Sequence, residues 1–145
     1  MAHQLEVYYE FEHDDEPVVV STPEQAGEVL ERMRAAYADR WPVMAQVVVA
    51  GSTGFEYMHV GVHGDVGVVS YSGPLGGFHS LGEPVSGEVT YYYCGHNREL
   101  PANAQVRLAL VRQALIEFLT NGGGRPSCLG WQPMAMSWAR PQVVS

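Results

Sequence analysis

Two segments of this chain carry apolar residues at helical spacing, and strand-like runs precede, separate and follow them. The helical spacing covers residues 26–37 and again residues 106–119. Between them, short runs rich in Val and Tyr are interrupted by Gly and Pro, which is typical of strands joined by hairpins. The order strand, helix, strand meander, helix, strand predicts an α+β fold. Two helices would pack on one face of a mostly antiparallel sheet of about six to seven strands.

The first strand is predicted from strict alternation over residues 5–11. Leu5, Val7, Tyr9 and Phe11 would face the core, and the polar residues between them would face solvent. An acidic turn is expected to follow over residues 13–17. Further strands are expected at residues 43–50, 55–62, 66–71, 78–81, 88–93 and 128–131, with a loop over residues 95–103.

Capping signals place the two helices. Thr22 can cap the first helix, Pro23 suits its first turn, and Gln25 can complete a capping box. This helix should end near Asp39. The second helix is expected over residues 103–119, where Asn121 and the three glycines after it would stop it.

A length of 145 residues predicts one domain. We expect that domain to cover residues 1–131, with residues 132–145 as an irregular tail. No stretch approaches the roughly 18 consecutive apolar residues of a membrane span. The acidic N-terminus does not resemble a signal or transit peptide, so a cytoplasmic protein is expected. Cys94 and Cys128 are then expected to be free thiols.

The net charge is −8, and all eight basic residues are arginine. This excess of acids argues against direct binding to nucleic acid or to an anionic membrane, because both need cations that meet phosphates. It permits a basic protein partner.

Patterns typical of catalytic, metal or cofactor sites are missing or better explained otherwise. His59 and His63 are four apart on a predicted strand, roughly 13 Å, which is too far for one ion. Glu10 and Glu12 have the spacing of a glycosidase pair, but more acids surround them, so a solvated face explains them better. No phosphate-binding glycine loop is found. The sequence therefore predicts no enzyme, no metal ligand and no cofactor.

Acids and bases are distributed unevenly along the chain. The predicted strands carry only acids, and no arginine occurs between Trp41 and Asn97. If the helices cover one sheet face, the other face would be acidic, with Tyr8 and Tyr92 among its acids. Such a face could bind a basic partner or could simply keep the protein soluble, and the charge alone favours neither.

The second half of the chain resembles a known family. The motifs are GVVSY (67–71), GGFHSLG (76–82), YYYCG (91–95), ELP (99–101), EFLTNG (117–122), Arg125-Pro126 and Trp131. Their order is similar to that in the Imm1 family of bacterial immunity proteins, over roughly residues 24–131. The resemblance implies a cytoplasmic antidote that binds a toxin domain encoded by a neighbouring gene and blocks its active site. The toxins of this family are often nucleic-acid deaminases.

On this basis we expect contacts to a basic cognate toxin, and no catalysis by the chain itself. The predicted partner-binding residues are Glu6, Tyr8, Glu10, Glu12, Asp14, Asp15, Glu88, Tyr92 and Trp131. Two other hypotheses stay open. One is a small-ligand-binding or enzymatic domain with a tyrosine-lined pocket, and the other is a structural subunit or homodimer. We expect a monomer or a weak homodimer.

Overall fold

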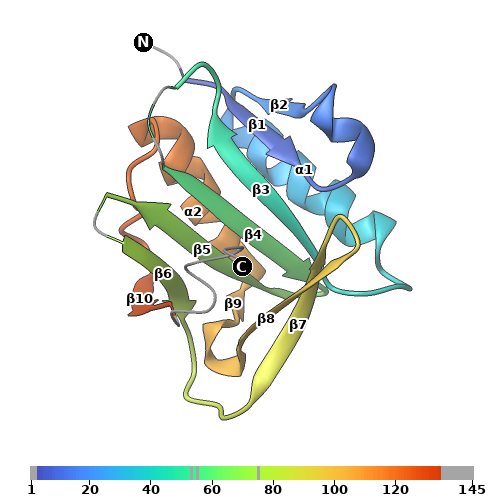
Figure 1. The fold of residues 1–145 in the computed structure, drawn as a ribbon, viewed down its shortest axis with the longest axis vertical. Helices are drawn as coiled ribbons and strands as arrows, with labels where there is room; N and C mark the ends of the chain where they lie inside the picture. The colour runs from blue at the N-terminus through green and yellow to red at the C-terminus, as the bar shows by residue number, and fades with distance from the viewer. Residues whose placement is uncertain (1–2, 53, 55, 75, 135–145) are drawn as a thin grey trace, which may run out of the picture.

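The computed structural model describes residues 3–52, 54, 56–74 and 76–134. Two α-helices, α1 (Pro23–Ala36) and α2 (Leu108–Asn121), lie side by side behind one face of a mostly antiparallel sheet (Figure 1). The predicted α+β class, with two helices on one face of the sheet, is confirmed, but α1 ends at Ala36, before the expected end near Asp39. The described part of the sheet has ten strands, more than the six to seven expected.

Seven strands form the main path of the sheet, in the order β10-β6-β5-β4-β3-β1-β2. The meander β3-β4-β5 at its centre is antiparallel, and β1 pairs with both β3 and β2. The strand β2 is too short to show a period, so the sequence did not predict it. The bounds are β1 Leu5–Tyr8, β2 Val18–Val20, β3 Val43–Val49, β4 Tyr57–His63, β5 Val66–Gly73, β6 Gly76–Leu81 and β10 Gly130–Pro133.

A hairpin of β7 (Glu88–Tyr93) and β8 (His96–Pro101) lies against the face opposite the helices (Figure 1). Its Tyr91 and Leu100 pack with Met44 and Val68 of the sheet to form a second, smaller core. The prediction of a loop over residues 95–103 is therefore wrong. The turn uses Cys94 and Gly95, both at positive φ, and Cys is not the Asn, Asp or Gly that usually marks such a turn.

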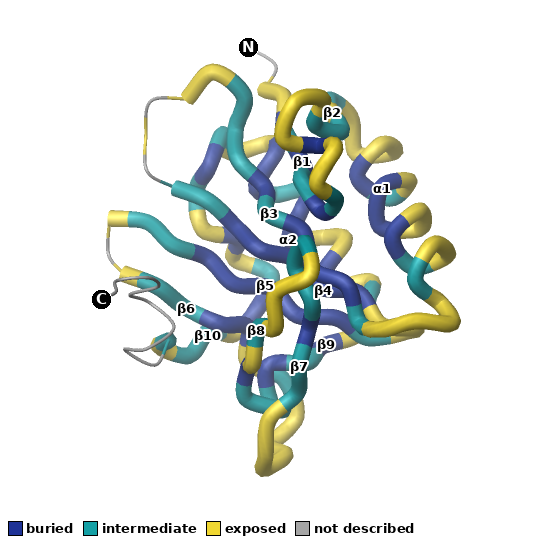
Figure 2. The backbone as a smooth tube through the Cα atoms, turned by 45° about the vertical axis from the view of Figure 1, so that its right-hand side comes forward, coloured by how far each residue is buried: buried dark blue, intermediate teal, exposed yellow. Residues whose placement is uncertain are grey.

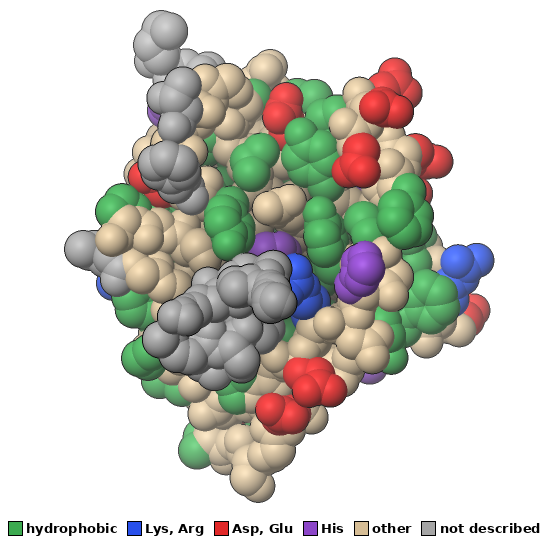
Figure 3. Space-filling model, viewed as in Figure 1, with side chains coloured by type: hydrophobic (Ala, Val, Ile, Leu, Met, Phe, Trp, Pro, Cys, Tyr) green, Lys and Arg blue, Asp and Glu red, His purple; other side chains and the backbone are tan. Residues whose placement is uncertain are grey.

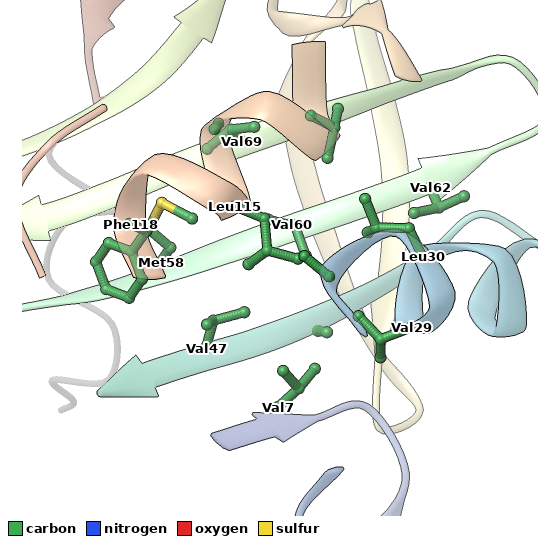
Figure 4. Packing of buried hydrophobic residues seen from close by; sticks show 14 of the residues in the cluster. Val7, Val29, Leu30, Val47, Met58, Val60, Val62, Val69, Leu115 and Phe118 are labelled. Carbon is green, nitrogen blue, oxygen red and sulfur yellow. The ribbon is translucent and has the colours of Figure 1, made fainter. Parts of the chain in front are cut away.

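The main core lies between the helices and the sheet. Every second residue of a central strand points into it, so on β4 Met58, Val60 and Val62 are buried there, while His59 faces the other way. Figure 2 shows the same division on α1: the side of the helix that faces the sheet is buried, and the opposite side is exposed. Figure 4 shows the packing of Val7, Val29, Leu30, Val47, Met58, Val60, Val62, Val69, Leu115 and Phe118.

The helix boundaries follow the caps. Thr22 Oγ1 accepts from the Gln25 backbone N–H at 3.2 Å, as predicted, while Gln25 Oε1 accepts from Ser21 N–H at 2.6 Å. The helix α2 starts at Leu108, later than predicted. Residues before it form a 3-10 turn, η2 (Ala102–Ala104), and a short strand, β9 (Val106–Arg107), that pairs with β5. Local periodicity could not reveal that pairing.

Two strand ends also differ from expectation. The strand β1 stops at Tyr8, so the predicted core position of Phe11 is wrong, and its side chain is 71% exposed. At the other end, Gln132 and Pro133 belong to β10, although they were expected in the tail. Residues 135–145 of that tail lie outside the described residues. Neither helix in the described part of the chain is long and apolar enough to cross a membrane.

Replacing Phe118 with Ala should lower the free energy of unfolding by roughly 3–5 kcal/mol, because a fully buried aromatic ring leaves a cavity. Phe118 is 0% exposed and contacts the Tyr71 ring edge-on, with centroids 6.3 Å apart. The matched control is Phe11→Ala, which should change stability by less than about 0.5 kcal/mol. Urea unfolding of both variants measures this, and equal losses would contradict the assigned core.

Candidate functional site

A short 3-10 turn, η1 (Phe11–Asp14), takes the chain away from the sheet after β1. Its geometry depends on His13, whose buried Nδ1 accepts the backbone N–H groups of both Tyr9 and Glu10 at 3.1 Å. The imidazole thereby satisfies two donors that a continued strand would have paired with a neighbour. As a result, Phe11 and Glu12 point outward to solvent.

Beside this turn, four aromatic rings form a continuous row from β1 through the end of α1 to β7. The centroid distances are 6.4 Å for Tyr9–Tyr37, 5.8 Å for Tyr37–Trp41 and 5.8 Å for Trp41–Tyr92. Trp41 is held here because the chain leaves α1 and enters β3 at Val43. Tyr92 reaches it because β7 meets β3 through the single parallel pair Val43–Tyr92.

The row lines a hollow of about 360 Å³ whose rim carries Glu10, Phe11 and Glu12. Tyr37 Oη donates to Glu10 Oε2 at 2.9 Å. Burial raises the pKa of Tyr37 to about 12, and the hydrogen bond to the Glu10 carboxylate adds to this effect. The phenol therefore stays protonated and acts as a donor that fixes the carboxylate. We call Glu10, Phe11, Glu12, Tyr37, Trp41 and Tyr92 the acidic aromatic corner.

Figure 3 views the sheet face opposite the helices. Acidic side chains gather at its upper right, over the region of β1, β2 and η1, with hydrophobic side chains between them. On this face, Tyr8 Oη donates to Glu6 Oε1 at 3.1 Å. Next to them, Tyr93 of the hairpin donates to Gln46 of β3 at 3.2 Å.

The centre of this face contains a serine–histidine pair. Ser70 Oγ lies 2.7 Å from His79 Nδ1, and the two residues are 1% and 2% exposed. Burial lowers the pKa of His79 to about 4. A nucleophile needs a substrate within reach and a base that accepts protons near neutral pH, so this pair is poorly suited to catalysis. It does not support the enzymatic alternative.

The predicted partner-binding residues divide into groups. Glu10, Glu12 and Tyr92 meet at the acidic aromatic corner, with Asp14 and Asp15 exposed on and just after η1. Glu6 and Tyr8 lie nearby on the open face. Tyr92 does not share that face with Tyr8, contrary to expectation, because alternate residues of β7 turn Tyr91 and Tyr93 toward the sheet and Tyr92 away from them.

Two predicted contact residues lie elsewhere. Glu88 is exposed at the start of β7. It lies about 17 Å along the strand from Tyr93, at the end of β7 that is near the corner. Trp131 faces the helix side and is partly buried. Its Nε1 donates to the Pro126 carbonyl at 3.0 Å and its ring lies 6.4 Å from that of Tyr71. These contacts give Trp131 a packing role.

Three corner residues escaped the sequence analysis. Phe11 was assigned to the core by alternation, and Tyr37 was read as part of the apolar stripe of α1. No partner contact was predicted for Trp41, which follows the first helix. The signal that the sequence offered was an aromatic residue between the end of a predicted helix and the next predicted strand. Only the register of β7 against β3 brings the rings together.

The structure also places Glu10, Glu12 and His13 so that their ligand atoms lie within 4.8 Å of one another, in the part of the chain it describes. His13 Nδ1 already accepts two backbone N–H groups. Exposed carboxylates commonly cluster without a metal, and we assign no ion here. His59 and His63, in contrast, stand apart on β4, where one is buried and the other exposed.

One family of known proteins matches most of this chain. Residues 14–133 match the family described as Immunity protein Imm1. A search of curated proteins found no match. The matched region includes both helices and nine of the ten strands, while β1 and the first residues of η1 precede it.

The two buried histidines of the open face should make folding sensitive to acid. Burial lowers the pKa of His59 to about 3, helped by the Arg98 charge, and that of His79 to about 4, from 6.5. The unfolded chain takes up protons below about pH 6.5 when the folded chain does not, so the free energy of unfolding should fall from there toward about pH 4.

Replacing His79 with Gln should flatten this decline, because Gln can still bond Ser70 but cannot take up a proton. Urea unfolding across this pH range measures the slope. His96→Gln, at an exposed position of β8, is the control and should leave the slope unchanged. If the free energy of unfolding of H79Q falls as steeply with pH as that of the wild type, burial of a neutral His79 does not cause the acid sensitivity.

Proposed function

Because this chain belongs to the Imm1 family of immunity proteins, we propose that it neutralises a cognate toxin domain by binding it at the acidic aromatic corner. The binding covers the surface through which the toxin engages nucleic acid. The protein performs no chemistry of its own in this role. It acts in the cytoplasm, as a monomer or weak homodimer, on a toxin encoded by a neighbouring gene.

The observation that carries this proposal is the concentration of exposed apolar side chains beside the acids. In the described part of the chain, five large apolar side chains are exposed. Three of them lie on η1 or line a hollow together with its residues: Phe11 at 71%, Val19 at 48% and Trp41 at 43%. Burying such groups against a partner is favourable, and aromatic residues are common anchors of protein interfaces. A surface that served only solubility would not gather them in one place.

The charge around these anchors indicates what kind of partner they meet. Glu10, Glu12, Asp14, Asp15 and Glu16 follow one another closely along the chain and are all at least partly exposed. A toxin domain that acts on nucleic acid needs a cationic groove to hold phosphates. Carboxylates presented on a folded turn can occupy such a groove and speed the encounter. A nucleic-acid deaminase is the toxin class we favour.

This proposal predicts that the acids of η1 steer association. Neutralising Glu12, Asp14 and Asp15 (E12Q/D14N/D15N) should slow association with the toxin domain encoded beside the gene by about ten-fold at low salt. It should also reduce the dependence of that rate on salt. Stopped-flow or surface-based kinetics at two salt concentrations measure both effects.

The control removes the same number of negative charges elsewhere. E83Q/E88Q/E99Q replaces exposed acids of the hairpin region and should slow association by less than about two-fold. Glu88 is included because the sequence predicted that it contacts the toxin, although it lies at the end of β7 that is away from the corner. If the control slows association as much as the η1 variant, the docking surface is not the corner. If the toxin domain does not bind at all, the proposed function is wrong.

A further inference from the structure

We propose that the hollow of the acidic aromatic corner receives one arginine side chain of the toxin, so that this chain recognises its partner through a single guanidinium anchor. The inference rests on the proposed function, and it names the chemical group that the partner must present. It follows from the rings, from the carboxylates and from the exposure of the site.

The rings provide surfaces on which a guanidinium can stack. The ring centroids of Tyr37 and Trp41 lie 5.8 Å apart, and their planes are inclined by 43°. The ring centroids of Trp41 and Tyr92 also lie 5.8 Å apart, with an angle of 59° between the planes. Trp41 stays 43% exposed beside the hollow. Cations within about 6 Å of an aromatic centroid are attracted to the ring face, most strongly for Trp, and the planar guanidinium also stacks well.

The protein's own Arg40 already lies near two of these rings, outside the hollow. Its guanidinium carbon lies 5.9 Å from the Tyr37 centroid and 6.0 Å from that of Trp41. Arg40 is exposed and is not among the residues that line the hollow. Arg32 lines a separate hollow, together with Glu12 and Glu16, and is not among the residues that line the hollow of the corner.

The carboxylates supply the acceptors. Glu10 is held in place because its Oε2 accepts the Tyr37 hydroxyl at 2.9 Å and its side chain also forms a capping box with His13. A carboxylate has about four lone-pair positions, so it can accept further donors. Ligand atoms of Glu10 and Glu12 lie within 4.8 Å of each other. A guanidinium carries five N–H donors in a fixed plane and can bridge two such carboxylates, whereas an ammonium is a compact point charge.

An apolar side chain would fit this hollow poorly. It would remove both carboxylates from water and add no donor beyond the Tyr37 hydroxyl that Glu10 already accepts. A carboxylate that loses water without gaining donors is unfavourable. A bound cation satisfies them and still buries its aliphatic stem against the rings. The volume of about 360 Å³ accommodates one long side chain.

The first experiment measures the toxin affinity of W41L and E10Q. The first variant removes the ring but keeps an apolar side chain, and the second removes one charge but keeps an acceptor for Tyr37. Each variant should raise the dissociation constant for the toxin domain by about 10- to 100-fold. The matched control is L81A, since Leu81 is 44% exposed but lies on β6, and it should change affinity by less than about two-fold.

The second experiment identifies the group that enters the hollow. Each surface Arg, Lys and large apolar residue of the toxin is replaced singly, with Met for the cations and Ala for the others. The replacements are combined with W41L in double-mutant cycles. One arginine should lose its effect in the W41L background. Coupling to an apolar residue or a lysine, or to no residue, would overturn the inference while the proposed function stands.

A third measurement separates failure of the inference from failure of the proposed function. If the wild-type chain does not bind the toxin domain, the proposed function fails, and the hollow is then tested alone with N-acetyl-arginine amide. The amide should shift the NMR signal of the Trp41 indole N–H, and the uncharged N-acetyl-citrulline amide should not. Equal shifts with both probes, or none with either, would overturn the inference.

Discussion

The burial of one sheet face beneath two helices is the constraint on which the rest of this structure depends. Side chains alternate along a strand, so packing Val60 and Val62 under α1 and α2 forces His59 to the opposite face. That opposite face cannot stay fully open, and the β7–β8 hairpin covers part of it with a second small core. Pairing of β7 with β3 at Val43–Tyr92 then places a tyrosine outside both cores, beside the end of α1. The aromatic row follows from these two packing layers.

A single imidazole decides how this corner is presented. By accepting two backbone N–H groups, His13 ends the strand pattern after Tyr8 and turns Phe11 and Glu12 outward. A strand continued to residue 11 would have buried Phe11 and spread the acids along an edge. The turn concentrates them in one place instead, next to rings that two other elements supply. Packing therefore places the rings and the turn places the carboxylates at the same surface, outside the core.

Neutralising a partner by binding imposes demands unlike those of catalysis. A catalytic site needs a reachable nucleophile and a base that accepts protons near neutral pH. The buried Ser70–His79 pair has neither property, and its polar groups serve each other within the fold. A binding surface needs exposed anchors and a charge that suits its partner, and the corner presents exposed aromatic side chains beside carboxylates. Membership of the Imm1 family agrees with this division, because an immunity protein acts through its surface.

The sequence by itself determined the α+β class, both helices, the caps at Thr22 and Gly122, and the central strands, because these depend on local periodicity and local hydrogen bonds. It also predicted an acidic partner surface with Glu10, Glu12 and Tyr92, and this assignment stays a prediction. Only the tertiary structure decided that β8 and β9 are strands, that Phe11 is exposed and that Trp131 packs inward. Those outcomes depend on pairings between residues far apart in the chain, such as Gly67 with Val106 and Val43 with Tyr92. Long-range register carries no local signature, so the acidic aromatic corner emerges only when the chain is folded.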